Sequence, residues 1–125
     1  MTEHPSLISL LSAISEARVL CVGDIMLDRF VSGDVARISP EAPVPVLRIN
    51  KETEMLGGVG NVIRNLHGLG GAVSLVATVG KDDAGATLNE QVLSLGQADP
   101  TLVVDEQRPT AIKTRYLAGN QQMLR

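Results

Sequence analysis

An acidic segment directly follows the first strongly apolar run of the chain. In Gly23–Asp28 (GDIMLD), Asp24 and Asp28 come just after the apolar run Val19–Val22. Ligands of open α/β sheets bind outside the carboxyl ends of such strands, and each carboxylate oxygen offers two acceptor sites. Asp28 is therefore suited to bind two neighbouring hydroxyls of a sugar. The alternative is that both carboxylates only cap turns.

A glycine-rich segment opens the next helical pattern. Gly57, Gly58 and Gly60 precede Asn61, whose amide both donates and accepts hydrogen bonds. Glycine lets a backbone approach a ligand closely, and a helix N-terminus presents unpaired N–H groups. The spacing is not GxGxxG, so the dinucleotide-binding fingerprint is missing. A phosphate, a neutral hydroxyl-rich ligand and a tight turn before a core helix all fit this segment.

A pair of cations follows near the end of the chain. Lys113 and Arg115 alternate in a strand-like segment, so they share one face of that strand. Two cations on one face can hold a phosphate monoester. The alternative is that they belong to a solvated edge.

The elements that must position these residues alternate along the chain. Helical spacing of apolar residues predicts three helices, and apolar runs predict four strands. The helices are expected over residues 7–16, over 59–69, and around Leu88–Leu95 after a cap by Asp82 or Asp83; the strands are expected over 19–22, 73–79, 102–104 and 110–117. The unbroken run at 19–22 predicts a strand buried on both faces. The βαβαβ order predicts a parallel sheet with right-handed crossovers.

Residues 30–50 have a different pattern. Pro40, Pro43 and Pro45 interrupt a partly alternating apolar sequence, and proline confines strands to edges or short pieces. We expect a small exposed β-unit that projects from the main sheet. Because the chain stops at Arg125 after a strand-like segment, we also expect a fragment of a longer protein.

Composition restricts the possible functions. The 125 residues are 44% apolar and 20% charged, with a net charge of −3, which is typical of one soluble domain. An acidic chain with only Phe30 and Tyr116 as aromatics is not expected to bind nucleic acid or anionic membranes. No apolar run approaches the roughly 20 residues of a membrane span, and no signal peptide precedes the first helix, so we expect a cytoplasmic protein. Cys21 and two histidines provide no disulfide and no metal cluster.

Three segments together resemble a known family. Val19–Asp28, Arg37–Val46 (RISPEAPVPV) and Gly57–Gly80 are similar to the start of the ribokinase-type, PfkB-family carbohydrate kinases. The sequence departs from the first family signature at Val59 and Ile63, where the family favours small residues.

One segment of the chain resembles a particular subgroup of that family. Arg37–Val46 resembles the D-glycero-β-D-manno-heptose-7-phosphate kinases, including the kinase half of the bifunctional heptose kinase/adenylyltransferase. Lys113, Arg115 and the run Asn120–Arg125 also match that subgroup.

The resemblance implies a fold of three α/β/α layers with a mostly parallel sheet and a small β lid. Residues 1–125 would be the N-terminal part of the kinase domain, and residues 30–50 would be the lid over the sugar. In relatives such lids pair, which implies a homodimer.

The resemblance also implies a substrate-binding site. Its residues would be Asp28, Gly57, Gly58, Asn61, Lys113 and Arg115. Asp28 would bind sugar hydroxyls, the glycines and the Asn61 amide would complete the pocket, and the two cations would point toward a 7-phosphate. We expect Asp28 and Asn61 to face one cavity shaped for a carbohydrate.

The implied activity is phosphotransfer from ATP, with Mg²⁺, to the anomeric hydroxyl of heptose 7-phosphate, in making ADP-heptose for lipopolysaccharide. The catalytic base and the ATP-binding half would lie beyond residue 125, so these residues alone should bind no cofactor and be inactive. Another sugar or nucleoside substrate in the same family, and a non-catalytic half-domain that only self-associates, are the alternatives.

Overall fold

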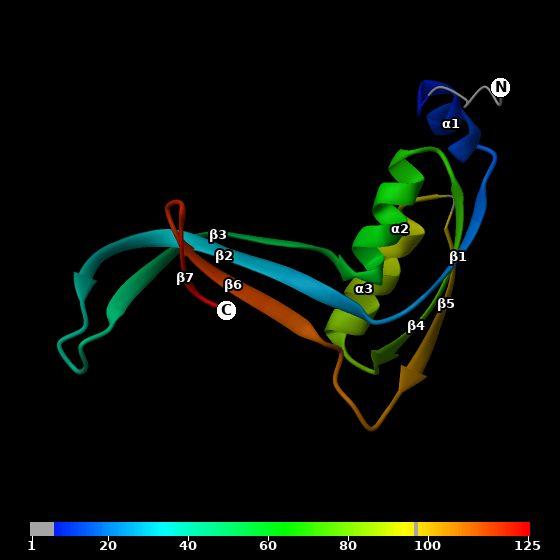
Figure 1. The fold of residues 1–125 in the computed structure, drawn as a ribbon. Helices are drawn as coiled ribbons and strands as arrows, with labels where there is room; N and C mark the ends of the chain where they lie inside the picture. Colours follow the sequence, from blue (N-terminus) through cyan, green and yellow to red (C-terminus); the bar gives the residue numbers. More distant parts are fainter. Residues whose placement is uncertain (1–6, 97) are drawn as a thin grey trace. The chain divides into compact units, whose positions relative to one another are not determined.

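The computed structural model describes residues 7–96 and 98–125, which fold into helices and strands in two compact units (Figure 1). The elements in chain order are α1 (Leu7–Ile14), β1 (Arg18–Val22), β2 (Ile25–Ile38), β3 (Pro45–Gly58), α2 (Val59–Gly68), β4 (Ala72–Gly80), α3 (Asp83–Leu93), β5 (Ala98–Asp105), β6 (Ile112–Ala118) and β7 (Gln121–Leu124). The first unit runs up to Met26 and resumes from Leu56 to Ala111, and the second comprises Leu27–Met55 and Ile112–Arg125.

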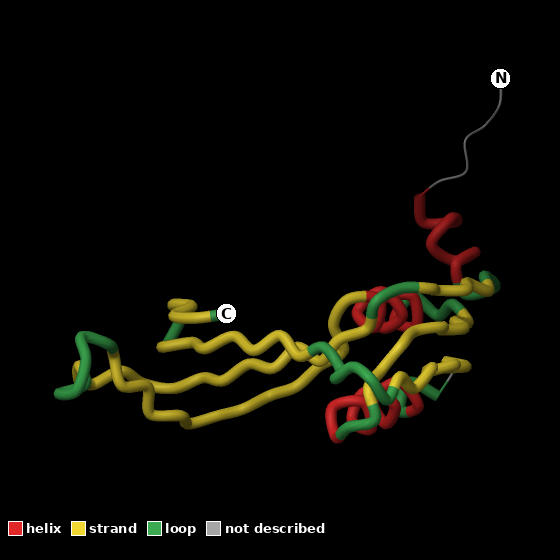
Figure 2. The backbone as a smooth tube through the Cα atoms, turned by 90° about the horizontal axis from the view of Figure 1, so that it is seen from below, coloured by secondary structure: helices red, strands yellow, loops and turns green. Residues whose placement is uncertain are grey.

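The first unit is built on a parallel sheet with the strand order β1-β4-β5. Both α2 and α3 lie on one face of this sheet (Figure 1, Figure 2). Alternate residues of β4 are buried because side chains along a strand point to opposite faces in turn. The core is aliphatic, and its most buried members in this unit are Ile25, Ile63, Leu75, Leu88 and Val92. The predicted βαβαβ order and its parallel sheet are thus confirmed.

The strand predicted at residues 19–22 is present as β1, but the prediction that both its faces are buried is wrong for the described residues. Cys21 is buried, whereas Leu20 and Val22 are 64% and 70% exposed. The cause is that α2 and α3 cover only the face to which Cys21 points. An apolar run alone does not tell whether one face or both are covered.

The start of α2 depends on Gly58. This residue has φ of 59°, and a Cβ there would collide with the carbonyl oxygen of Asp24. Glycine is required because both the positive φ and the close approach exclude a side chain. The same Asp24 carbonyl accepts a hydrogen bond of 2.9 Å from the N–H of Val59. Asp24 therefore acts at this turn through its backbone.

The start of α3 is fixed by Asp82, one of the two predicted caps. Its Oδ1 accepts a 2.8 Å hydrogen bond from the N–H of Gly85, and its Oδ2 accepts one of 2.8 Å from the N–H of Thr110. The hydroxyl of the buried Thr110 in turn accepts a 2.8 Å hydrogen bond from the N–H of Gly80. One carboxylate thus caps the helix and connects it to the segment before β6.

Substitution of Gly85 should destabilise this junction strongly. A Cβ there would lie 2.5 Å from the carbonyl oxygen of Gly80 and 3.1 Å from Oγ1 of Thr110, and backbone cannot move away cheaply. We expect Gly85→Ala to lower the free energy of unfolding by about 2–3 kcal/mol. The matched control is Gly68→Ala, because nothing lies within 4 Å of its Cβ position. Urea unfolding at neutral pH measures both, and equal effects would contradict the packing argument.

The second unit is a sheet with the strand order β3-β2-β6-β7. β2 and β3 run in opposite directions and are joined by residues 39–44 (Figure 1). β6 pairs parallel to β2, with Leu27 opposite Ile112 and Gly33 opposite Ala118, and β7 returns antiparallel to β6. The sheet therefore combines a local hairpin with a strand from much later in the chain.

Polar pairs and one glycine hold β2 against β3. Nε of Arg29 donates to Oε1 of Glu54 at 2.7 Å, and Nδ2 of Asn50 donates to Oδ2 of Asp34 at 2.5 Å. A Cβ at the buried Gly33 would overlap the backbone carbonyl of Arg48, so only glycine permits this strand spacing.

The β-structure predicted over residues 30–50 is present, although its strands extend beyond those limits to 25–38 and 45–58. The strand predicted at 110–117 is also present as β6, but it pairs with β2 and not with the sheet of β1. The strand β7 has no counterpart in the sequence prediction. Whether residues 30–50 act as a lid stays a prediction.

Candidate functional site

Asp28 and Arg115 form an ion pair in the second unit. Asp28 lies on β2 opposite Lys113 of β6, and Phe30 lies opposite Arg115. Nη1 of Arg115 is 3.1 Å from Oδ1 of Asp28, and the two side chains are 19% and 18% exposed. The guanidinium carbon of Arg115 also lies 4.9 Å from the centre of the Phe30 ring. The strand register thus brings a carboxylate, a guanidinium and an aromatic ring together.

The ion pair does not satisfy all of its own polar atoms. Oδ1 of Asp28 and Nη1 of Arg115 are buried and have no hydrogen-bond partner among the described residues, because the charged contact lacks hydrogen-bond geometry. Each of these two atoms therefore depends on the opposite charge 3.1 Å away, and not on a hydrogen bond, to offset its desolvation.

Lys113 differs from Arg115 although both were predicted on one face of a strand. Lys113 is exposed and makes no ion pair with any residue that the structure describes, whereas the Arg115 side chain is largely buried against Asp28. The two cations are therefore not equivalent, which their alternation in the sequence does not reveal.

The glycine segment and Asn61 lie in the first unit. Gly57 is buried, Gly58 precedes the first residue of α2, and no side chain caps this helix. Asn61 is exposed, and its Oδ1 accepts a 2.8 Å hydrogen bond from Nη2 of Arg64. The helix start thus offers backbone N–H donors, and the Asn61 amide nitrogen is a further donor. That Asp28 and Asn61 bind one sugar stays a prediction, since they belong to different units.

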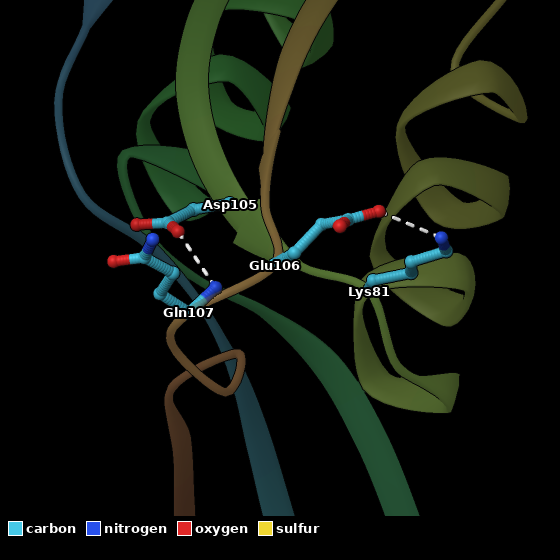
Figure 3. A network of polar contacts seen from close by, with 4 residues as sticks. All are labelled: Lys81, Asp105, Glu106 and Gln107. Carbon is cyan, nitrogen blue, oxygen red and sulfur yellow. Dashed lines mark hydrogen bonds and ion pairs between the residues drawn. The ribbon is translucent and has the colours of Figure 1, made fainter.

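A second polar region surrounds the start of α3. A cavity of about 540 Å³ there is lined by the end of β4, the first turns of α3 and Leu102 and Val104 of β5. Lys81 at its rim pairs with Glu106 at 2.7 Å, and Oδ1 of Asp105 accepts a 2.9 Å hydrogen bond from the N–H of Gln107 (Figure 3). The Lys81–Glu106 pair is about 70% exposed on both sides, so it contributes little to stability.

Hydrogen bonds hold the pKa of Asp82 below its ordinary value. The side chain of Thr110 has the largest effect, followed by the backbone N–H groups of Thr110 and Gly85, while desolvation acts in the opposite direction. Both carboxylate oxygens are used in this way. Asp82 is thus a structural carboxylate and not a candidate catalytic acid.

The stability of the protein should therefore depend on pH through Asp82. A folded-state pKa below the unfolded one stabilises the fold above about pH 4, and this contribution is lost as the pH falls through the folded-state pKa. Asp82→Asn keeps a capping side chain but does not titrate. We expect the wild type to have the higher urea midpoint at about pH 6 and to lose this advantage progressively as the pH is lowered below about 4. An advantage that is constant with pH would contradict the role of the charge.

An apolar groove of about 350 Å³ lies in the second unit. It is lined by residues of all four strands of this sheet and by the residue before β3. They are Val35, Val44, Pro45, Leu47, Tyr116, Met123 and Leu124. Val44 and Leu124 are 51% and 62% exposed. Sequence reasoning did not find this groove because β7 was not predicted.

Residues 7–96 and 98–125 contain neither a cluster of metal ligands nor a helix that could cross a membrane. Among them, no three His, Cys, Asp or Glu side chains gather closely enough to hold a metal ion. None of the described helices has the length and apolar character needed to cross a membrane.

Comparison with known proteins identifies the class to which this fold and these residues belong. A family model described as pfkB family carbohydrate kinase matches residues 16–124. The chain therefore belongs to the pfkB family of carbohydrate kinases, and the expected ribokinase-like α/β fold is confirmed.

Two curated relatives are particularly similar. Bifunctional protein HldE of Rhodospirillum rubrum is 47% identical over 125 residues, and the protein of the same name from Paramagnetospirillum magneticum is 52% identical over 125 residues. The comparison covers 100% of this chain but only 25% and 26% of these relatives. The chain thus spans about a quarter of their length.

Solved structures support the same fold. A carbohydrate kinase from Agrobacterium tumefaciens superimposes with a TM-score of 0.70 at 24% identity, and ribokinase from Giardia lamblia with a TM-score of 0.65 at 20% identity. Each comparison covers 86% of this chain and 34% of the other chain.

Proposed function

We propose that residues 1–125 are the N-terminal, sugar-binding part of a cytoplasmic, ATP-dependent kinase that phosphorylates heptose 7-phosphate at its anomeric hydroxyl, for ADP-heptose and lipopolysaccharide synthesis. The observation that carries this proposal is the largely buried Asp28 carboxylate with cations beside it, in a chain that belongs to a carbohydrate kinase family. Carboxylates bind neighbouring hydroxyls well, and an exposed Lys113 one strand away suits a phosphate.

Sequence similarity to particular relatives supports heptose 7-phosphate as the sugar. The relatives named bifunctional protein HldE are about half identical to this chain, and Arg37–Val46 resembles the heptose 7-phosphate kinases. In this proposal Asp28 binds sugar hydroxyls, and Gly57, Gly58 and Asn61 complete the sugar site with backbone and amide donors.

ATP and Mg²⁺ would be held outside this chain. The described residues provide no acidic cluster for a divalent ion, and no Gly-Ala-Gly-Asp-like segment occurs in the sequence. Mg²⁺ would neutralise the charge that develops on the transferred phosphoryl group. The contribution of this chain is to bind and orient the sugar.

Steady-state kinetics of the full-length protein test the proposal. With ATP and Mg²⁺, we expect kcat/KM for heptose 7-phosphate to exceed that for ribose, fructose 6-phosphate and a nucleoside by at least about 100-fold. Phosphorus NMR of the product should show a phosphate on the anomeric oxygen. A preference for ribose, fructose 6-phosphate or the nucleoside would support the kinase activity but contradict heptose 7-phosphate as the substrate. Transfer to none of the acceptors, heptose 7-phosphate included, would favour the non-catalytic half-domain.

We also propose that the second unit pairs with a second copy of the chain to form a homodimer. The apolar groove supports this, because exposed apolar surface of that kind marks an interaction site. Leu124→Asp should shift the full-length protein from dimer to monomer in size-exclusion chromatography with light scattering. The matched control is Leu93→Asp, an equally apolar and 55% exposed residue outside the groove, which should leave the dimer intact. A wild-type monomer at all concentrations would contradict this proposal.

A further inference from the structure

Arg115 makes two contacts to residues of β2. Its guanidinium is 3.1 Å from the Asp28 carboxylate and 4.9 Å from the ring centre of Phe30. Asp28 and Phe30 are two residues apart, so they project from the same face of the strand. The guanidinium is thereby held by a carboxylate and by an aromatic ring at the same time.

The shape of the guanidinium matters for this arrangement. It is planar and always charged, so one group can stack on a ring and also pair with a carboxylate, which a lysine ammonium cannot do equally well. Because both charged side chains are more than four-fifths buried, each depends on the other to offset its desolvation. The charge of Arg115 is thus already used within the protein.

Lys113 provides the contrast. It is exposed and is unpaired within the described part of the chain. A substrate phosphate can reach this ammonium without breaking an existing ion pair, whereas recruiting Arg115 would leave Asp28 buried without its partner.

We infer that Arg115, held against Phe30, is a positioning residue that fixes the Asp28 carboxylate for the sugar hydroxyls, and that Lys113, and not Arg115, supplies a cation for the substrate phosphate. This inference rests on the proposed function and changes one part of the sequence expectation, in which both cations point toward the phosphate. Oδ1 of Asp28 faces Arg115, which leaves the second carboxylate oxygen for a ligand.

A double-mutant cycle on the full-length enzyme tests the inference. Arg115→Gln should lower kcat/KM for heptose 7-phosphate by about 30-fold in the wild type, but by less than about 3-fold in the Asp28→Asn background, because its effect acts through Asp28. Lys113→Gln is the matched control and should cost the same factor in both backgrounds. Equal losses from Arg115→Gln in both backgrounds would show direct contact with the substrate and overturn the inference.

Variants of Phe30 test the positioning itself. Phe30→Leu should raise KM for the sugar by about 5-fold with little change in KM for ATP, and Phe30→Tyr should retain wild-type values because it keeps the ring. Arg115→Lys should not restore activity. Full rescue by lysine, or wild-type kinetics in Phe30→Leu, would contradict a role for the stacked guanidinium. Thermal unfolding of each variant shows whether a loss of activity comes from misfolding. If Phe30→Leu or Arg115→Gln is misfolded, the kinetics of Phe30→Tyr and Arg115→Lys decide whether the stacked guanidinium positions Asp28.

Failure of the inference and failure of the proposed function give different results. A wild-type enzyme without activity on heptose 7-phosphate contradicts the proposed function. An active wild type with an additive Arg115→Gln and Asp28→Asn cycle contradicts only the positioning role.

Discussion

A polypeptide of residues 1–125 should transfer no phosphoryl group from ATP to heptose 7-phosphate, at any enzyme concentration that gives full turnover with the full-length protein. Phosphoryl transfer needs donor, metal and acceptor positioned together. In the proposed function, the catalytic base and the ATP-binding half lie outside residues 1–125, so the donor and the acceptor cannot be positioned together by these residues alone. Release of ADP in a coupled assay, with the full-length protein in parallel, measures this.

The same polypeptide must be folded for this result to be informative. Circular dichroism should show both helix and strand, as the structure contains. The face of its first sheet that is turned away from α2 and α3 exposes Leu20, Val22 and Val103, and apolar faces of this kind bind hydrophobic dyes. Sugar-dependent ADP release by a folded polypeptide of residues 1–125 would show that the whole catalytic apparatus lies within it, and would contradict the proposal that the catalytic base and the ATP site lie outside these residues.

Asp28→Asn should lower kcat/KM of the full-length enzyme for heptose 7-phosphate by about 100- to 1,000-fold. The substitution keeps the size of the side chain and one acceptor oxygen, but it removes the charge that pairs with Arg115. The guanidinium is then buried without a counter-ion, and breaking a buried pair typically lowers the free energy of unfolding by about 3–5 kcal/mol. A carboxylate that accepts hydroxyl hydrogen bonds also binds them more strongly than a neutral amide.

Asp34→Asn is the matched control for that prediction. Asp34 lies on the same strand, but it is exposed and accepts its hydrogen bond from Asn50. Its substitution should change kcat/KM by less than about 2-fold, because exposed polar contacts contribute little. Steady-state kinetics and the melting temperature should be measured for both variants. If Asp28→Asn retains activity within about 3-fold of the wild type, Asp28 does not bind the sugar.

The sequence predicted the local elements well because their causes are local. Val59, Ile63 and Leu66 follow helical spacing, and Asp82 has the side chain and the position that cap a helix. Gly58 was singled out because glycine lets a backbone approach a ligand closely, and the structure shows a close approach to the Asp24 carbonyl, which fits the alternative of a tight turn before the helix. The helical spacing and the cap at Gly85 depend on neighbours within a few residues, whereas the contact of Gly58 with Asp24 joins positions far apart in the sequence.

The arrangement at the candidate site could not be predicted in the same way. That β6 pairs with β2, with Phe30 opposite Arg115, depends on a register between segments more than 80 residues apart. Alternation predicted that Lys113 and Arg115 share one face of the strand. It did not predict which of the two cations would pair with Asp28. Phe30 had no predicted role, because its importance arises only when the two strands lie side by side.

The structure of the full-length enzyme with heptose 7-phosphate bound is the most direct test of the sugar site. It should place the Asp28 carboxylate within about 3.2 Å of two sugar hydroxyls, with the Asn61 amide on the same molecule and Lys113 at the phosphate. A sugar bound without any contact to Asp28, while Asp28 contacts only Arg115, would contradict the role of Asp28 in sugar binding.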